Sequence, residues 1–401
     1  MKTMPNGFKK PRSFFGSVFP RKAVGLLALL SLVWPALAQK EQWLEYHTST
    51  ENRGYRILEI STNPPAGVPL PKFRSAKPYF GRWTTPMDAK GGRWFCFDTT
   101  RKSGPYDRVY FDSTGNGRLD DKTPAAATRS DNYNAFFDPI KVVFKGEDGP
   151  VAYHLNVRFM QYDGSPAQVL LSSGGYYSGP VAFGSKKYRL SLYDNNVNGI
   201  FNDPSSQGGG GGDRLSVEGD KSGPRFLGKL LDLDGEFFRI EVARDGAFVK
   251  VEKASDIVLG TVRVPETISE FVALGENGHF IRKPAKGEFT LPSGKYRVYS
   301  WTINRKDAKG ASWALEGSRF DSRGDFVVSA GSTPALNIGE PARSVLGVEE
   351  TRSPLSFDLS FVGPLGESLN FSRNNENPPP PRLTLAGLDG KYRSTNTFEF
   401  G

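Results

Sequence analysis

Residues 108–121 read RVYFDSTGNGRLDD, and this stretch sets the expected fold because an alternating segment runs directly into a short polar loop. The first four residues alternate polar and apolar side chains, which is the period of a half-buried β-strand. Asn116 and Gly117 follow as a pair that favours tight turns, since both residues tolerate positive φ. Residues 189–203, RLSLYDNNVNGIFND, repeat the order of strand and loop, with the loop 82 residues further on.

The rest of the sequence has the same β character. Its 45 Gly and 29 Pro are spread along the chain, which divides it into short segments and argues against long helices. Asp-Gly pairs at Asp234-Gly235 and Asp245-Gly246 predict hairpin turns between strands. We expect an all-β chain in two domains with few short helices, the best helical candidates being 41–47 and 267–273. Strands are predicted chiefly at 140–144, 152–159, 188–193, 237–242, 248–251, 296–303, 355–361 and 381–385.

The first 38 residues have the pattern of an export signal. A basic lead precedes an apolar run at 23–34 and the small-residue sequence Ala36-Leu37-Ala38. The apolar run is too short to span a bilayer comfortably, so a cleaved signal peptide is favoured over the alternative of an uncleaved anchor. We expect a secreted or periplasmic protein with no membrane span after signal cleavage.

Charge argues against one class of partner. Six of the 52 Lys and Arg residues and none of the 43 Asp and Glu residues fall within residues 1–38, so residues 39–401 carry a net charge of only +3. No Lys/Arg-rich run and no nucleic-acid motif remain in this part of the sequence, which disfavours nucleic-acid binding.

A domain boundary is expected near Ser255. Both polar loops lie before it, in a predicted β domain of residues 39–254, and a new run of strands starts after it. Residues 289–299, FTLPSGKYRVY, indicate a turn that feeds an aromatic strand, so residues 255–401 are predicted to form a β-sandwich domain. The only cysteine, Cys96, lies among aromatic residues and is expected to be buried rather than reactive.

The two polar loops carry oxygen-bearing side chains at alternate positions before a glycine, an arrangement that can wrap a calcium ion. Position seven adds a backbone carbonyl, and an acid three or four residues after the glycine closes the site. The predicted ligands are Asp112, Thr114, Asn116, the Arg118 carbonyl and Asp120 or Asp121 in the first loop, and Asp194, Asn196, Asn198, the Ile200 carbonyl and Asn202 or Asp203 in the second. Asp213 is expected to add a carboxylate to the second site, and Asp131 is a candidate for the first. One or two structural Ca²⁺ ions are therefore predicted.

These loops resemble those of EF-hand and dockerin-type calcium proteins over about ten residues. The chain as a whole resembles secreted bacterial β-rich proteins of unassigned activity that carry such loops. The resemblance implies calcium ligands at loop positions one to seven. It does not extend to the helix-loop-helix fold, because strands precede both loops, nor to the bidentate Glu, whose positions hold Thr123 and Ser205. The alternative is that both Asn-Gly pairs form ordinary turns without metal.

Nothing in the sequence indicates a catalytic centre. The three histidines are far apart and no zinc-protease or hydrolase signature is present. We therefore favour a binding or interaction module with structural calcium over an enzyme, with carbohydrate or another exported protein as its partner. Tyr176 and Tyr177 are the predicted exposed contacts. The alternative is a carbohydrate-active hydrolase that uses a pair of carboxylates.

Overall fold

The structure is a computed structural model that describes residues 40–399 except 52, 103, 147–148, 206–210 and 351–354. The predicted signal peptide lies outside the described residues. Among those that are described, the only helical element is the short 3-10 turn η1 (Ser322–Gly324), and no helix is long and apolar enough to cross a membrane. The prediction of an all-β chain is confirmed.

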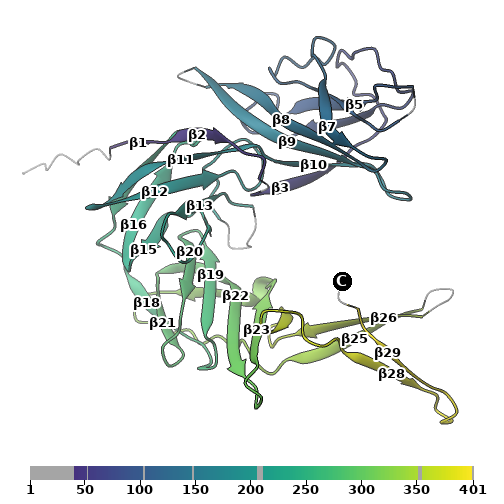
Figure 1. Cartoon of the computed structure of the whole chain (residues 1–401). Coiled ribbons are helices and arrows are strands. Elements are labelled where there is room, and N and C mark those ends of the chain that lie inside the picture. The colour runs from purple at the N-terminus through teal and green to yellow at the C-terminus, as the bar shows by residue number, and fades with distance from the viewer. Residues whose placement is uncertain are drawn as a thin grey trace, which may run out of the picture. The chain divides into compact units, whose positions relative to one another are not determined.

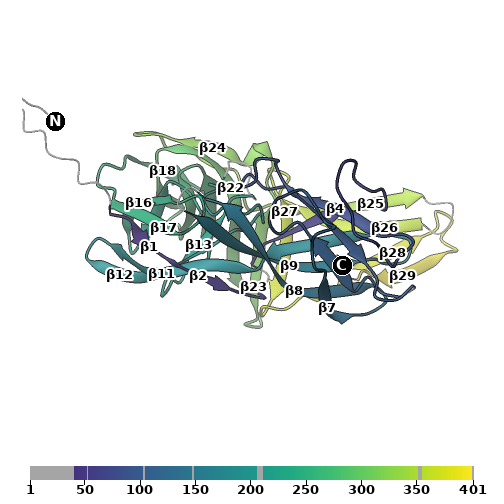
Figure 2. The ribbon, with the colours of Figure 1, turned by 90° about the horizontal axis from the view of Figure 1, so that it is seen from above.

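Three antiparallel sheets are built from the first part of the chain (Figure 1). The first sheet has the order β3 (Tyr55–Glu59), β10 (Gln168–Ser173), β9 (Pro150–Met160), β8 (Asn134–Lys145), β7 (Ala125–Ser130), β6 (Arg108–Phe111), β5 (Arg93–Asp98), β4 (Tyr79–Trp83). The second sheet has the order β14 (Arg225–Phe226), β13 (Arg214–Val217), β12 (Lys186–Tyr193), β11 (Gly175–Phe183), β2 (Glu45–Thr48). The third sheet has the order β1 (Gln42–Trp43), β17 (Phe248–Lys253), β16 (Glu236–Val242), β15 (Leu230–Leu233). The long strands β8 and β9 lie side by side in Figures 1 and 2.

Three further sheets come from the rest of the chain. The fourth sheet pairs β18 (Leu259–Arg263) with β21 (Glu288–Pro292). The fifth has the order β20 (Gly278–Arg282), β19 (Glu270–Gly275), β22 (Gly294–Lys306), β23 (Ser312–Ser318), β27 (Ser368–Arg373), β26 (Leu355–Val362), β25 (Arg343–Glu350), and β24 (Asp325–Val328) also pairs with β22. The sixth is the hairpin of β28 (Arg382–Ala386) and β29 (Arg393–Thr397).

Local sequence explains the turns. Asp234 and Gly235 join β15 to β16 with φ angles of 52° and 79°, the positive values that Asp-Gly pairs tolerate in two-residue hairpins. All eight predicted strand segments lie within or overlap observed strands. Both helical candidates are wrong, because 41–47 and 267–273 contribute to strands instead. In β2, His47 pairs with Tyr176 of β11, and this tertiary pairing overrides weak local propensity.

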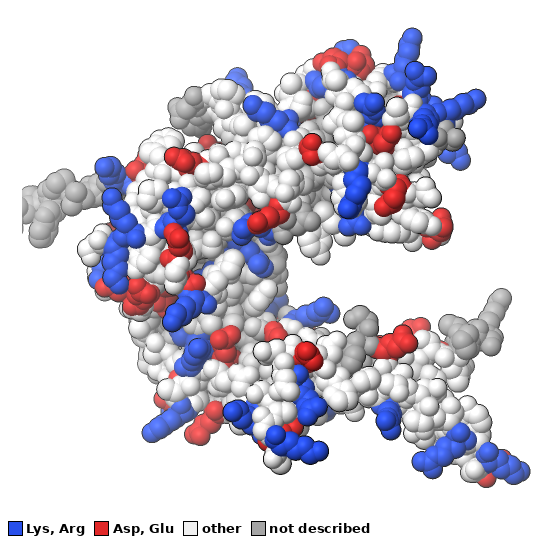
Figure 3. Space-filling model, in the orientation of Figure 1, with Lys and Arg blue, Asp and Glu red and all other residues white. Residues whose placement is uncertain are grey.

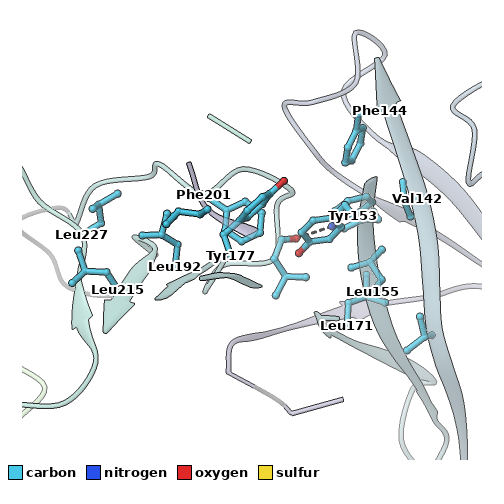
Figure 4. Close-up of a cluster of buried hydrophobic side chains, with 14 of the residues drawn as sticks. Val142, Phe144, Tyr153, Leu155, Leu171, Tyr177, Leu192, Phe201, Leu215 and Leu227 are labelled. Carbon is cyan, nitrogen blue, oxygen red and sulfur yellow. Dashed lines mark hydrogen bonds between the residues drawn. The ribbon is translucent and has the colours of Figure 1, made fainter. Parts of the chain in front are cut away.

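Buried apolar side chains gather in two large clusters. The first has buried members between Leu44 and Val249, and the second between Val262 and Leu369. In the first cluster Phe201 joins two sheets (Figure 4). Its ring centroid lies 6.1 Å from that of Tyr153 in β9 and 5.1 Å from that of Tyr177 in β11. A smaller cluster contains Cys96, whose predicted burial is confirmed by its exposed fraction of 0%.

Candidate cation sites in two equivalent loops

Each polar loop starts where a strand ends. The first loop (residues 112–121) follows β6 and the second loop (residues 194–203) follows β12. One apolar side chain is buried at the same position of each, Leu119 with 0% exposed and Phe201 with 2% exposed. These two side chains pack one end of each loop against a hydrophobic cluster, Leu119 beside Cys96 and Phe201 in the first large cluster.

The first aspartate of the first loop turns inward and organises the bend. Asp112 is buried, and its carboxylate accepts hydrogen bonds from the backbone amides of Gly115 at 2.9 Å, Asn116 at 3.1 Å and Gly117 at 2.8 Å. An aspartate that accepts hydrogen bonds from backbone amides of its own turn stabilises that turn, because those amides have no partner in a neighbouring strand.

The second loop is organised in the same way. The buried Asp194 carboxylate accepts hydrogen bonds from the amides of Asn198 at 3.2 Å and Gly199 at 2.6 Å. It also accepts one from the hydroxyl of Tyr153 at 2.8 Å, which comes from β9 of the first sheet. The second loop is thus held to two sheets.

A later acid closes each loop through an asparagine. The Asn116 side-chain amide donates to Asp121 at 2.7 Å, and the Asn198 amide donates to Asp203 at 2.6 Å. The oxygens of both asparagines meanwhile accept the backbone amide two residues further on. Asn116 therefore meets Asp121 in the first loop and Asn198 meets Asp203 in the second, although Thr114, Asn116 and Asp121 of the first loop remain exposed to solvent.

Some predicted ligands lie outside these arrangements. Asp120 forms an ion pair with Arg118 at 2.6 Å and so faces away from the loop centre. Asn202 is half-buried in the second loop. Asp131 instead caps the turn between β7 and β8, where it accepts the amides of Tyr133 and Asn134.

The first loop already surrounds a positive charge, the ammonium of Lys122. The Lys122 side chain is only 9% exposed. Its nitrogen lies 2.8 Å from Thr114 Oγ1, 3.1 Å from Asn116 Oδ1, 3.0 Å from Asp121 Oδ1 and 3.8 Å from Asp112 Oδ1. Oxygens predicted to bind a metal are thus directed at a cation that belongs to the chain. Lys122 directly follows Asp121 in the sequence but was not predicted to take part in this site.

The second loop has no cation at the matching position. The residue equivalent to Lys122 is Pro204. Three acidic side chains nonetheless lie in and beside this loop: Asp194, Asp203 and Asp213. Among the described residues, none of the three forms an ion pair with a Lys, Arg or His side chain (ion pairs at 4.0 Å or less).

Strand pairing places Asp213 beside the second loop. It precedes β13, which pairs with β12, and it is 1% exposed. Its carboxylate accepts the backbone amides of Asn195 at 3.1 Å and Asp203 at 2.8 Å. Burial raises the pKa of Asp213 well above its usual range, and the neighbouring charges of Asp194 and Asp203 raise it further. Burial also raises the pKa of Asp194, although amide and hydroxyl donors partly offset that effect.

Asn196 adds an unpaired polar atom to the second loop. Its Oδ1 atom is buried and has no hydrogen-bond partner among the described residues, while its Nδ2 atom donates to Asp203 at 2.7 Å and to the Gly211 carbonyl at 2.5 Å. Turning the side-chain amide over would place its oxygen among these two oxygens. Such a cluster of oxygens needs a donor or a positive charge from outside the loop, either a water molecule or a cation.

Carboxylates alone do not make a metal site here. Among the described residues, no group of three or more His, Cys, Asp or Glu side chains lies close enough together to hold a metal ion. A cation in the second loop would therefore need amide and carbonyl oxygens and water as well as carboxylates.

The predicted aromatic contact is only partly exposed. Tyr177 is 8% exposed and packs in the core with its ring centroid 5.0 Å from that of Tyr46, so its predicted exposure is wrong. Alternation along β11 turns it inward, while Tyr176 faces the other side, half-buried and stacked on His47 at 5.3 Å.

A different tyrosine pair is more exposed. Tyr133 and Tyr162 are 44% and 47% exposed, and their rings stack with centroids 6.0 Å apart at an interplanar angle of 19°. Beside Tyr133 lies a hollow of about 270 Å³, whose polar lining includes Asp131, Asn134 and Gln161. No sequence pattern predicts this pair, because the two residues come from different turns of the first sheet.

Comparisons with family models, with curated proteins and with solved structures found no match.

Proposed function

We propose that this chain is an exported calcium-binding β protein, secreted or periplasmic, that acts as a binding module and takes a structural Ca²⁺ at the second loop. The observation that carries the proposal is the first loop, where the same arrangement of side chains encloses an ammonium. The second loop has the same bend, and its Asp194 and Asp203, together with the neighbouring Asp213, form no ion pair with a Lys, Arg or His side chain among the described residues. Calcium suits it because Ca²⁺ accepts mixed shells of carboxylate, amide, carbonyl and water oxygens.

The role proposed for the ion is to stabilise the second loop rather than to catalyse. The Asp194 carboxylate is bound to Tyr153 and to amides of its own loop, and these contacts tie the loop to the first sheet. A divalent ion would offset the repulsion among the three nearby acids. Figure 3 shows acidic and basic side chains interspersed over one face, which fits a surface without a strong preference for highly charged partners.

Calcium is expected to stabilise the unaltered protein. At a free Ca²⁺ concentration a hundredfold above the dissociation constant, the free energy of unfolding should rise by about 2.7 kcal/mol. Asp203→Asn should remove most of this increase, because it deletes a carboxylate that faces the loop centre. The measurement is urea unfolding of residues 39–401 in EDTA and in 1 mM Ca²⁺.

Asp234→Asn is the matched control for this experiment. Asp234 precedes a glycine in the β15–β16 hairpin, has a positive φ and lies outside both loops. This variant should respond to calcium as the unaltered chain does. Identical unfolding curves with EDTA and with calcium would rule out the proposed function.

We also infer that residues 255–401 form a separate β-sandwich domain. The second hydrophobic cluster supports this inference, since its buried members all lie between Val262 and Leu369. A domain needs a hydrophobic core of its own to fold as a unit.

Carbohydrate is the proposed partner, and the Tyr133 and Tyr162 pair favours it. Exposed aromatic rings beside polar groups suit sugar rings, which present apolar C–H faces and hydroxyl edges. Tyr133→Ala and Tyr162→Ala should each weaken binding to a recognised polysaccharide about three- to tenfold, or roughly 0.6–1.4 kcal/mol. Tyr392→Ala, at a tyrosine that is 58% exposed, is the control.

Native gels that contain soluble β-glucan, xylan or pectin provide the measurement. A recognised polysaccharide retards the unaltered protein and the Tyr392→Ala variant equally, and it retards the other two variants less. Equal migration of all four proteins in every gel would exclude this partner class for the tyrosine pair.

A further inference from the structure

We propose that Lys122 is a built-in cation that replaces a metal ion in the first loop, so the chain has a single divalent-cation site, at the second loop. The divalent-cation site at the second loop rests on the proposed function, whereas the exclusion of metal from the first loop does not.

The hydrogen bonding of Lys122 is complete within the loop. An ammonium has three hydrogens to donate, and three oxygens lie at 2.8–3.1 Å from it, on Thr114, Asn116 and Asp121. The Asp112 carboxylate adds a fourth oxygen at 3.8 Å. These are side chains that the calcium motif assigns to positions one, three and five and to the closing acid. The ammonium therefore occupies the centre that a metal would need.

Charge opposes a second cation at this centre. Two carboxylates face the ammonium, and two further cations border the loop. The Arg93 guanidinium, 3% exposed, pairs with Asp88 at 3.1 Å and donates to the Ser113 carbonyl at 2.7 Å, and the Lys90 ammonium donates to the Asn116 carbonyl at 3.3 Å. Backbone carbonyls that could serve a metal are thus already bound by positive groups. A divalent ion within a few Å of these groups would be repelled.

The Lys122 ammonium can replace a metal ion effectively because it is covalently attached to the loop. Lys122 directly follows Asp121, so folding of the loop delivers its ammonium at high effective concentration. Pro204 at the matching position of the second loop cannot do this, and within the described ranges no Lys, Arg or His side chain forms an ion pair with Asp194, Asp203 or Asp213. The two loops therefore meet the same need for positive charge in two ways, one internal and one from solution.

Counting bound calcium tests this inference. Native mass spectrometry of residues 39–401, with calcium titration calorimetry, should find one ion per unaltered chain and none after Asp203→Asn. Lys122→Met keeps most of the aliphatic stem but removes the charge, and it should raise the count to two. Lys122→Gln is the second variant in case Lys122→Met does not fold.

Lys141→Met is the matched control. Lys122 and Lys141 both line a hollow of about 580 Å³ beside the first loop. Among the described residues, Lys141 forms no ion pair with an acid of that loop. This variant should keep the count at one.

The outcomes separate the inference from the proposed function. Two ions in the unaltered chain would overturn the inference and leave the proposed function standing. No ion in the unaltered chain, but one in Lys122→Met, would support the inference and overturn the proposed function. A count that stays the same in both Lys122 variants up to 10 mM Ca²⁺ would overturn the inference.

Discussion

Trp83→Ala should lower the free energy of unfolding by about 3–5 kcal/mol and weaken calcium binding at the second loop. Trp83 ends β4 and is 0% exposed. Its ring stacks on Tyr153 with centroids 5.6 Å apart and an interplanar angle of 14°. Its indole N–H donates to the Val197 carbonyl at 2.7 Å, within the second loop. One side chain thus fills the core and holds a loop residue whose φ is 54°, an uncommon value for valine.

Trp83→Phe separates these two roles. It keeps an aromatic ring but leaves the buried Val197 carbonyl without its donor, which should cost about 1–3 kcal/mol. Trp43→Ala, at a tryptophan that is 63% exposed, should cost much less. Urea unfolding with and without calcium measures all three variants. A Trp83→Ala protein as stable as Trp43→Ala would contradict the role assigned to Trp83.

Strand content and turns could be predicted because they depend on local sequence. Alternation along 188–193 and 296–303 and the Asp-Gly pairs act over a few residues, and the structure has strands and turns there. Pairing between distant strands could not be predicted in this way. The segment 41–47 lacks a strong local preference, and parts of it become strands through pairing with β17 and with β11.

The loops were predictable, but the charge at their centres was not. Spacing alone identified the acids and the Asn-Gly bends, and it placed Asp213 as a neighbour of the second loop. The two loops were expected to bind calcium in the same way, but that expectation did not take into account the residue after each closing acid. The sequence does show this difference between the two similar loops, with Lys122 after the first and Pro204 after the second. The role of Lys122 depends on its side chain pointing into the loop, and the spacing of residues along the sequence does not predict that direction.

Acid should destabilise this protein partly through His279, by about 3 kcal/mol between pH 6.5 and pH 4. His279 lies in β20, and its Nδ1 atom accepts the backbone amide of Phe226 at 3.2 Å, so the ring is neutral in the native state. Burial lowers the pKa of His279 to about 4, and the positive charges of Arg225 and Arg214 lower it further in the same direction.

The sign follows from where protons bind. An unfolded histidine has a pKa of about 6.5, so below that pH the unfolded state binds a proton that native His279 does not. The free energy of unfolding therefore holds its full His279 contribution above pH 6.5 and loses it as the pH falls towards 4. His279→Asn offers an oxygen to the Phe226 amide without a titrating group. Its stability should fall less steeply than that of the unaltered chain across this window, while carboxylates affect both proteins alike. Parallel curves of unfolding free energy against pH would show that His279 is protonated equally in the folded and unfolded states. That result would contradict the half-buried, neutral ring that accepts the Phe226 amide.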